Sequence, residues 1–181
     1  MLVYVVGPSG AGKDTLMNGA RARLAGDDTF VFVRRHITRP ADAGGEDHIE
    51  IGAAEFDANA REGAYILSWQ AHGLSYGIPK EIAGAVAAGK IAVVNGSRAC
   101  IDMARERFSR IRIVHVTAPE AVLRRRLEAR GRETMADVQA RLGRAQAVES
   151  DAPDTVTLQN DSDIETGISR FVALLQGCPK A

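Results

Sequence analysis

The chain has 181 residues, of which 45% are hydrophobic and 25% are charged, and its 23 basic side chains balance its 23 acidic ones. This composition fits one globular domain, and the zero net charge gives no reason to expect nucleic acid or a membrane surface as a partner. Two cysteines, Cys100 and Cys178, are too few for a disulfide framework, and the apolar start MLVYVV is too short for a signal peptide or a membrane span. We therefore expect a cytoplasmic protein.

The first part of the chain alternates strand and helix patterns. Residues 2–6 form an unbroken apolar run that ends at a glycine, which is typical of a strand buried on both faces. After a glycine-rich stretch, apolar residues recur at helical spacing as far as Gly26, a residue that favours the end of a helix. Residues 29–35 (TFVFVRR) predict a second strand.

Residues 34–77 interrupt this alternation with short strand patterns. A loop rich in Gly and Asp covers residues 36–47, and the strand HIEI and a helix over 53–62 follow it. The segments AYILSW and LSYGI are predicted to pair as strands around QAHG. We therefore expect a small β-rich insert.

The alternation resumes after the insert. The patterns predict a helix over IPKEIAGAVAAG, a strand at 91–96, a helix to 107 and a strand at 111–117. One helix then runs from after Pro119 to about Arg130, a second runs on to about Glu149, and the strand TVTLQ follows. The last predicted element is a C-terminal helix whose core face is formed by Ile164, Ile168, Phe171, Val172 and Leu175. Strands without polar alternation, separated by helices, predict a parallel sheet covered on both faces. The arginine-rich helical pair around 120–150 is a candidate lid.

The stretch GPSGAGKDTL, residues 7–16, carries the strongest chemical signal. It lies between a buried strand and a helix, where a phosphate-binding P-loop is expected. Glycines let the backbone N–H groups curl around phosphate oxygens, and the helix start adds unpaired N–H groups and a partial positive charge. We expect Lys13 to reach the terminal phosphates. The predicted nucleotide-binding residues of this stretch are Gly7, Pro8, Ser9, Gly10, Ala11, Gly12, Lys13, Asp14 and Thr15.

Asp14 stands where a P-loop normally has the Ser or Thr that binds Mg²⁺. A carboxylate can fill that role, since Mg²⁺ prefers hard oxygen ligands. Two interpretations stay open: either Asp14 binds the metal and makes nucleotide binding more metal-dependent, or Thr15 takes over the hydroxyl role and Asp14 points away.

Several motifs occur in one order along the chain: GPSGAGK, ITRP followed by GE, SYG, RLEARGRE with ARL, and QND. In this order they resemble guanylate kinase over nearly the whole chain. The resemblance implies a P-loop kinase fold, with a central parallel sheet flanked by helices, a small β-rich acceptor-binding insert and a helical lid. It divides a single domain into a core (1–33, 78–119 and 150–181), an acceptor-binding insert (34–77) and a lid (120–149).

The resemblance also implies roles for individual residues. Lys13 and the lid arginines Arg126, Arg130 and Arg141 would act on the transferring phosphates. Asn160 would lie beside the adenine of ATP. Arg39 and Tyr76 match groups that hold the phosphate of the acceptor.

The departures from guanylate kinase concern recognition of the acceptor. Ser68 stands where that family has a glutamate that reads guanine, and the strand end VVNGSRA has Asn95 and Arg98 but no carboxylate. A site that has lost these acceptors should lose guanine specificity and suit a smaller, more anionic acceptor. The predicted acceptor-binding residues are Arg35, Arg39, His48, Ser68, His72, Tyr76, Asn95 and Arg98.

The segments HITRP, DHI, LSWQAHGLSYGIP and VNGSRA resemble one branch of the guanylate-kinase-like family, the ribose 1,5-bisphosphate phosphokinases of phosphonate catabolism. This resemblance implies transfer of the ATP γ-phosphate to ribose 1,5-bisphosphate, giving 5-phosphoribosyl 1-diphosphate and ADP, with Mg²⁺, in a monomer or homodimer. Two alternatives stay open: a nucleoside monophosphate kinase of the guanylate type, or a non-catalytic binding module of the same fold.

Overall fold

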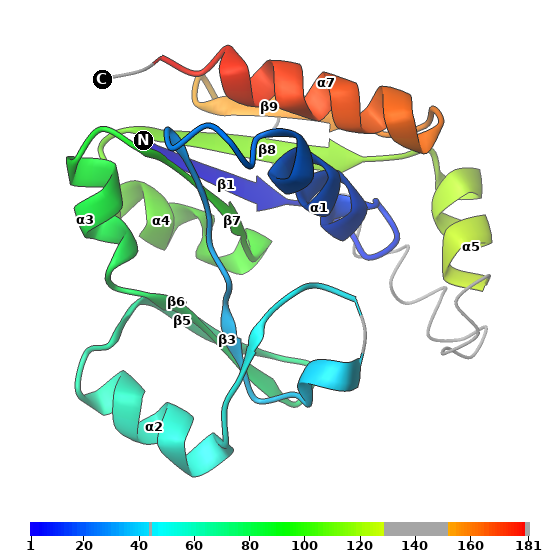
Figure 1. The fold of residues 1–181 in the computed structure, drawn as a ribbon. Helices are drawn as coiled ribbons and strands as arrows, with labels where there is room; N and C mark the ends of the chain where they lie inside the picture. The colour runs from blue at the N-terminus through cyan, green and yellow to red at the C-terminus, as the bar shows by residue number, and fades with distance from the viewer. Residues whose placement is uncertain (44, 129–151, 180–181) are drawn as a thin grey trace. The chain divides into compact units, whose positions relative to one another are not determined.

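The computed structural model of the chain describes residues 1–43, 45–128 and 152–179. It contains a five-stranded sheet with the strand order β2-β7-β1-β8-β9 (Figure 1). These strands are β1 (Leu2–Val6), β2 (Phe30–Phe32), β7 (Ile91–Asn95), β8 (Ile111–Thr117) and β9 (Thr155–Gln159). The β2–β7 and β8–β9 pairs are parallel, and every residue of β1 and β7 is buried. The predicted α/β fold with a central parallel sheet flanked by helices is confirmed.

The described residues divide into two compact units. The first consists of Met1–Tyr4, Asp27–Ile111 and Pro179, and the second of Val5–Gly26 and the described residues of Arg112–Cys178. This division differs from the predicted core, insert and lid, which stay a prediction. Residues 129–149 of the predicted lid lie outside the described residues.

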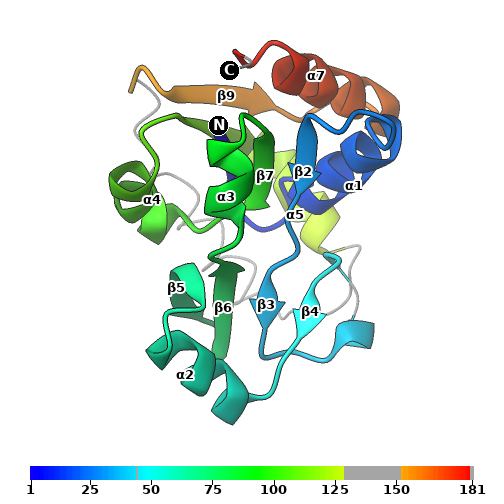
Figure 2. The same ribbon diagram turned by 60° about the vertical axis from the view of Figure 1, so that its left-hand side comes forward.

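The first unit contains a second sheet with the order β4-β3-β6-β5 (Figure 2). Its strands are β3 (His36–Ile37), β4 (Ile49–Glu50), β5 (Tyr65–Ala71) and β6 (Leu74–Pro79). Helix α2 (Ala53–Arg61) packs against β5 and β6, and the Phe56 ring stacks on Tyr65 with 4.8 Å between the centroids. The predicted insert thus forms its own small sheet.

The β5–β6 hairpin closes through two residues, His72 and Gly73. Both have positive φ, 54° and 73°, as a type I′ turn requires at its two central positions. The same unit contains α3 (Ile82–Ala87) and α4 (Ile101–Arg107), and the short 3₁₀ helices η1 (Ala41–Ala43) and η2 (Arg98–Cys100).

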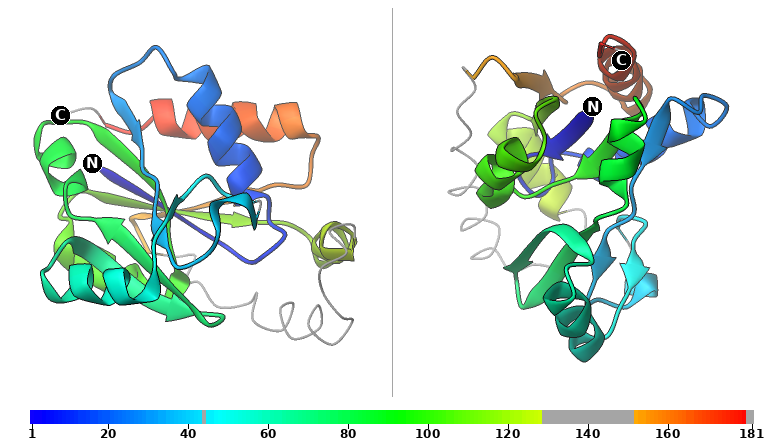
Figure 3. Two further views of the ribbon diagram at one scale, coloured as in Figure 1. Left: turned by 60° about the horizontal axis from the view of Figure 1, so that its bottom comes forward. Right: turned by 90° about the vertical axis from the view of Figure 1, so that its left-hand side faces the viewer.

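The described residues of the second unit form the helices α1 (Lys13–Arg23), α5 (Glu120–Glu128) and α7 (Ile164–Gln176). Helices α1 and α7 pack on each other (Figure 3, left). They approach so closely that a Cβ on Gly19 would lie 2.3 Å from Ile168 Cδ1. The Asp163 side chain caps α7 by accepting a hydrogen bond from the Thr166 N–H at 2.9 Å. Bonding to Thr166 lowers the pKa of this carboxyl.

Two predictions about local structure are corrected. Strand β2 ends at Phe32 rather than at residue 35, because the chain then leaves the first sheet and enters the second at His36. Ile164 does not belong to the core face of α7: it is the first helical residue and is 63% exposed, whereas Ile168, Phe171 and Leu175 are buried.

Cys100 and Cys178 are buried free thiols, and burial raises the pKa of each. Within the described ranges, no helix is both long and apolar enough to cross a membrane.

Candidate active site

The loop between β1 and α1 has a backbone that requires glycine at two positions. Gly7 and Gly12 have φ of 149° and 88°. A Cβ on Gly7 would lie 2.0 Å from the carbonyl oxygen of Val116, and a Cβ on Gly12 would lie 2.5 Å from Asn160 Nδ2. Gly12 is also the residue from which α1 starts, so the loop leads directly into the unpaired N–H groups of that helix. The backbone conformation is suited to an anion such as a nucleotide phosphate.

Lys13 reaches back across this loop. Its ammonium group donates hydrogen bonds to the carbonyl oxygens of Gly7 at 2.8 Å and of Pro8 at 3.1 Å. The side chain therefore places a positive charge at the loop. Lys13 and the loop were predicted together from sequence, and the structure brings them together.

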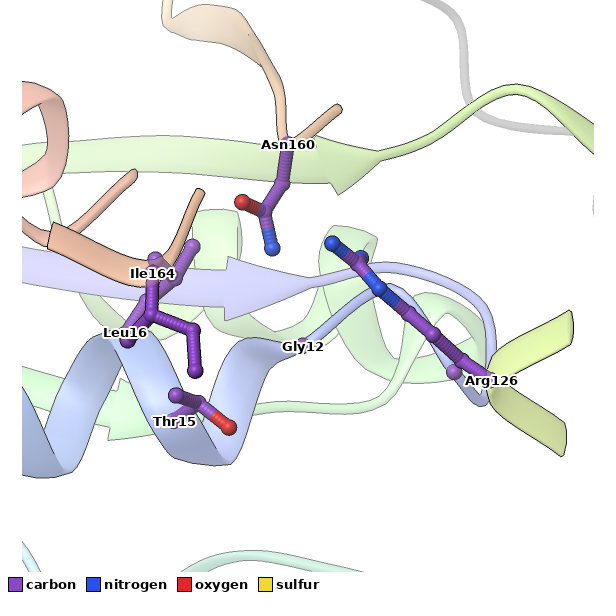
Figure 4. Close-up of a pocket in the computed structure, with 7 residues that line it drawn as sticks. Gly12, Thr15, Leu16, Arg126, Asn160 and Ile164 are labelled. Atoms are coloured by element: carbon purple, nitrogen blue, oxygen red, sulfur yellow. The ribbon is translucent and has the colours of Figure 1, made fainter. Parts of the chain in front are cut away.

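Asn160 fixes the loop from the end of β9. Its side chain is 6% exposed, and Nδ2 donates to the Ala11 carbonyl at 2.8 Å. Its backbone N–H donates to the Thr117 carbonyl at 2.7 Å, which joins β9 to the end of β8. Figure 4 shows the Asn160 amide nitrogen pointing toward the loop at Gly12. The amide nitrogen is therefore occupied with holding the loop, a positioning role that the resemblance did not indicate.

A pocket of about 250 Å³ opens beside this loop. Arg126, from α5, extends toward it, and its NH1 lies 3.5 Å from the Ala11 carbonyl oxygen (Figure 4). Thr15 and the exposed Ile164 form part of its wall, but Asp14 does not line it. The full lining is Gly10, Gly12, Thr15, Leu16, Arg126, Asn160 and Ile164. The other predicted lid arginines, Arg130 and Arg141, lie outside the described residues.

The predicted acceptor-binding residues belong to the first unit, where the main feature is a buried ion pair. Arg35 and Glu46 form a two-point pair, with Arg35 Nε 2.8 Å from Glu46 Oε1 and a second bond from NH2 to Oε2. Asn95, at the end of β7, donates from Nδ2 to the same Oε2 at 2.8 Å. The side chains of Arg35 and Glu46 are only 9% and 15% exposed. The carboxylate is thus bound by a cation and an amide.

Two aromatic rings lie beneath Arg35. Trp69 and Tyr76 are cross-strand neighbours on β5 and β6, and their rings stack with 5.4 Å between centroids and 4° between planes. The Arg35 guanidinium lies 5.4 Å from the Trp69 ring centroid and 5.0 Å from that of Tyr76. The rings and the ion pair together hold Arg35 in place.

His48 ties together the loop that carries Glu46. The ring is 3% exposed, and Nδ1 and Nε2 each lie 3.0 Å from a backbone carbonyl oxygen, of Glu46 and of Arg39 respectively. Carbonyl oxygens only accept hydrogen bonds, so the ring nitrogen that carries the proton donates to the backbone of the loop itself. The structure gives His48 a role in shaping the loop, where the sequence suggested contact with the acceptor.

Arg39 and Arg98 differ from Arg35 because each has a buried nitrogen without a hydrogen-bond partner in the described part of the chain, Arg39 Nε and Arg98 NH1. Arg98 begins η2, just after β7. The residue before it, Ser97, is fixed by Tyr4, whose hydroxyl accepts from Ser97 N at 2.9 Å and donates to Ser97 O at 3.2 Å. Burial raises the pKa of the Tyr4 hydroxyl, which therefore stays protonated at neutral pH.

Two predicted residues lie apart from this group. Ser68 is exposed and, because side chains alternate along a strand, lies on the opposite face of β5 from Trp69. His72 is exposed at the hairpin turn, and its left-handed backbone is the conformation that this two-residue turn requires.

Sequence reasoning did not assign roles to Glu46 and Tyr4. Glu46 was noted only as part of the GE motif, and the motif does not show which cation it meets. Tyr4 lies in an apolar strand, and the only signal was a single polar group in a run that was expected to be buried.

Comparison with known proteins matches this arrangement. The family model for guanylate kinase matches residues 1–176. The ribose 1,5-bisphosphate phosphokinase PhnN of Rhizobium etli is 45% identical over 98% of this chain and 90% of its own length. The bifunctional ribose 1,5-bisphosphokinase-thymidine phosphorylase of Cupriavidus pinatubonensis is 47% identical over 95% of this chain, which spans only 28% of that protein.

The structure also resembles a solved guanylate kinase. The crystal structure of guanylate kinase from Anaplasma phagocytophilum superposes with a TM-score of 0.65 at 20% identity, covering 100% of this chain and 89% of that one. At this identity the likeness shows the fold, which is that of a P-loop kinase. The sequence match over nearly the whole chain shows more, and from it we conclude that the chain belongs to the guanylate kinase family.

Proposed function

We propose that this chain transfers the γ-phosphate of ATP to the 1-phosphate of ribose 1,5-bisphosphate, giving 5-phosphoribosyl 1-diphosphate and ADP. The names of the relatives at 45–47% identity support this acceptor. The positive charge of Arg39 and Arg98, in the same unit as Glu46, also supports an anionic acceptor. A guanine edge presents N–H donors, and its recognition needs free acceptors.

The observation that carries the proposal is the state of Glu46. It is the buried carboxylate of the loop before β4, and it already accepts hydrogen bonds from Arg35 and Asn95. A carboxylate held in this way is a poor receptor for the N–H edge of a purine. Arg39 and Arg98, by contrast, carry buried nitrogens without partners, which suit an anion.

Transfer needs no side-chain base in this mechanism. The attacking atom is an oxygen of the acceptor phosphate, which is already anionic near pH 7. It forms a bond to the γ-phosphorus as the bond from that phosphorus to the β–γ bridging oxygen breaks, and ADP leaves. Lys13 and the loop backbone bind the donor phosphates, and Arg126 is placed beside the loop to neutralise charge. We propose that Arg130 and Arg141 add to this charge, and that Arg39 with Tyr76 holds the reacting phosphate.

Asp14 suits Mg²⁺ by its chemistry and its place. Its carboxylate lies in the first turn of α1, next to Lys13, and hard oxygen is the ligand type that Mg²⁺ prefers. Thr15 lines the pocket of Asn160 and Ile164, and Asp14 is not among its lining residues. We propose Asp14 as the metal ligand on its charge and its place in the first turn of α1, with Thr15 as the rival ligand. Bound Mg²⁺ would neutralise charge on the β- and γ-phosphates.

The metal assignment is tested by ATP binding with and without Mg²⁺. Without metal, the Asp14 carboxylate repels phosphate, since two like charges 4 Å apart repel by about 4 kcal/mol at an effective dielectric of 20. Asp14→Ser should therefore bind ATP more tightly than the parent in the absence of Mg²⁺. An unchanged affinity would rule out this account, and Thr15→Ala is the matched variant for the rival ligand.

The function is tested by a coupled assay for ADP release with two acceptors, ribose 1,5-bisphosphate and GMP. We expect turnover of the sugar bisphosphate and at most weak turnover of GMP. Lys13→Met should abolish transfer, and Lys80→Met, at an exposed lysine, should not. Efficient phosphorylation of GMP would refute the proposal, and an absence of Mg-ATP binding in calorimetry would favour a non-catalytic module.

A further inference from the structure

The arginines around the loop before β4 fall into two groups by their partners. Arg34 pairs with Asp47 at 2.8 Å, and Arg35 pairs with Glu46. Each of these two positive charges is already matched by a carboxylate. They contribute little net attraction for an added anion.

Arg39 and Arg98 have no carboxylate partner among the residues that the structure describes. The Arg39 guanidinium has a neutral partner instead, since its NH2 lies 3.4 Å from His48 Nδ1. Arg39 Nε and Arg98 NH1 are buried and lack hydrogen bonds. A buried donor without a partner costs free energy, and a bound anion would remove that cost.

Arg98 is held where ligands of α/β sheets bind. It lies three residues beyond Asn95, the carboxyl end of β7, a strand of the parallel sheet. Its backbone is fixed because Tyr4 binds Ser97 and leaves no room beside Gly96, where a Cβ would lie 2.2 Å from the Tyr4 ring. Asn95, three residues before it, is bonded to Glu46, which connects this strand end to the loop between β3 and β4.

We propose that Arg98 binds the phosphate of the acceptor that does not react, the 5-phosphate of the sugar, and so selects a bisphosphate over a monophosphate. This inference rests on the proposed function, which gives the reacting phosphate to Arg39 and Tyr76. A sugar bisphosphate brings two dianionic groups, and of the four arginines compared above, Arg39 and Arg98 are the two that pair with no described carboxylate. Arg98 is the one left for the second phosphate.

The test is a crossed inhibition experiment on turnover of ribose 1,5-bisphosphate. Ribose 5-phosphate and ribose 1-phosphate serve as competitive inhibitors of the parent, Arg98→Gln and Arg39→Gln. A charged hydrogen bond is worth about 1.5–3 kcal/mol, or roughly 10- to 100-fold in affinity. Arg98→Gln should raise the inhibition constant of ribose 5-phosphate by about that factor and leave that of ribose 1-phosphate within about twofold. Arg39→Gln should show the reverse pattern.

Two further variants serve as controls. Arg105→Gln removes one positive charge from α4, where Arg105 pairs with Asp102, and should change neither inhibition constant. Arg98→Lys keeps the charge at the site and should retain part of the preference for ribose 5-phosphate, even if Arg98→Gln does not fold.

Each outcome decides between the proposals. If Arg98→Gln and Arg98→Lys weaken both inhibitors equally, or neither, the assignment of Arg98 is wrong while the proposed function stands. If the parent does not turn over ribose 1,5-bisphosphate at all, the proposed function fails and the assignment fails with it.

Discussion

The ion pair between Arg35 and Glu46 should contribute strongly to the stability of the loop between β3 and β4, residues 38–48. Its side chains are only 9% and 15% exposed, so water can replace either partner only in small part. Removing one partner of a buried pair costs about 3–5 kcal/mol, because the other charge is left buried and unpaired. We expect a loss of this size for Glu46→Ala and a smaller loss for Glu46→Gln, which retains one acceptor oxygen.

The measurement is urea unfolding of the single variants and of the double variant Arg35→Ala/Glu46→Ala. For a chain of this length, a loss of about 3–5 kcal/mol in the free energy of unfolding would lower the Tm in thermal unfolding by roughly 6–20 °C. The double variant should lose clearly less than the sum of the two single losses, since it leaves no unpaired charge. The contacts of Arg35 with Trp69 and Tyr76 should make Arg35→Ala costly in any background.

The neighbouring pair supplies a matched control. Arg34 and Asp47 are 2.8 Å apart but 49% and 43% exposed. An exposed pair contributes about 0–1 kcal/mol, so Asp47→Ala should have little effect. The reasoning would be refuted if Glu46→Ala cost no more than Asp47→Ala, or if the Arg35 and Glu46 losses were simply additive.

Three further changes test other parts of the structure. Gly12→Ala should reduce ATP affinity at least about tenfold in calorimetry, because Gly12 has a left-handed backbone and the new Cβ would lie 2.5 Å from Asn160 Nδ2. Gly26→Ala is the control, since a Cβ there meets nothing within 4 Å. Tyr4→Phe removes both hydrogen bonds to the Ser97 backbone and should lower the free energy of unfolding by about 1–3 kcal/mol in urea, and a loss near zero would contradict the anchoring role. The pKa of the Asp163 carboxyl is lowered in the folded state, so its stabilising effect is present above the unfolded-state pKa of about 3.9 and is lost as the pH falls through the folded-state pKa. Asp163→Asn should therefore weaken the fall in the urea midpoint toward low pH. An identical pH profile for the variant and the parent would refute this.

The loop at residues 7–13 could be predicted from sequence because its determinants are local. The glycines, the lysine and the flanking strand and helix all lie within about 20 residues, and each has a single physical reason. The β5–β6 hairpin is a similar case, since Gly73 and the strand patterns on either side predict a tight turn. Both features depend on residues that are neighbours in the sequence, so they could be predicted without knowing the rest of the fold.

Features that depend on distant partners could not be predicted in this way. Contact of Arg35 with the acceptor stays a prediction, but its pairing with Glu46, 11 residues away, and its place over two rings from other strands were not foreseen. Contact of Asn160 with adenine likewise stays a prediction, and the bond from its amide nitrogen to Ala11, 149 residues away, was not foreseen. Periodicity and motif spacing contain no information about such pairings.

The residue type alone does not identify a phosphate-binding arginine in this chain. The sequence alone does not distinguish Arg34, Arg35, Arg39 and Arg98. Three of them, Arg35, Arg39 and Arg98, were predicted to bind the acceptor, and Arg34 is the neighbour of Arg35. They separate only when the hydrogen-bond partners of each guanidinium are examined: two are matched by Asp47 and Glu46, and two retain buried nitrogens without partners. The matched arginines shape the loop, and on our proposal Arg39 and Arg98 provide the positive charge for a ligand. On that proposal, a more anionic acceptor requires no additional arginines, only that Arg39 and Arg98 have no carboxylate partner before the ligand binds.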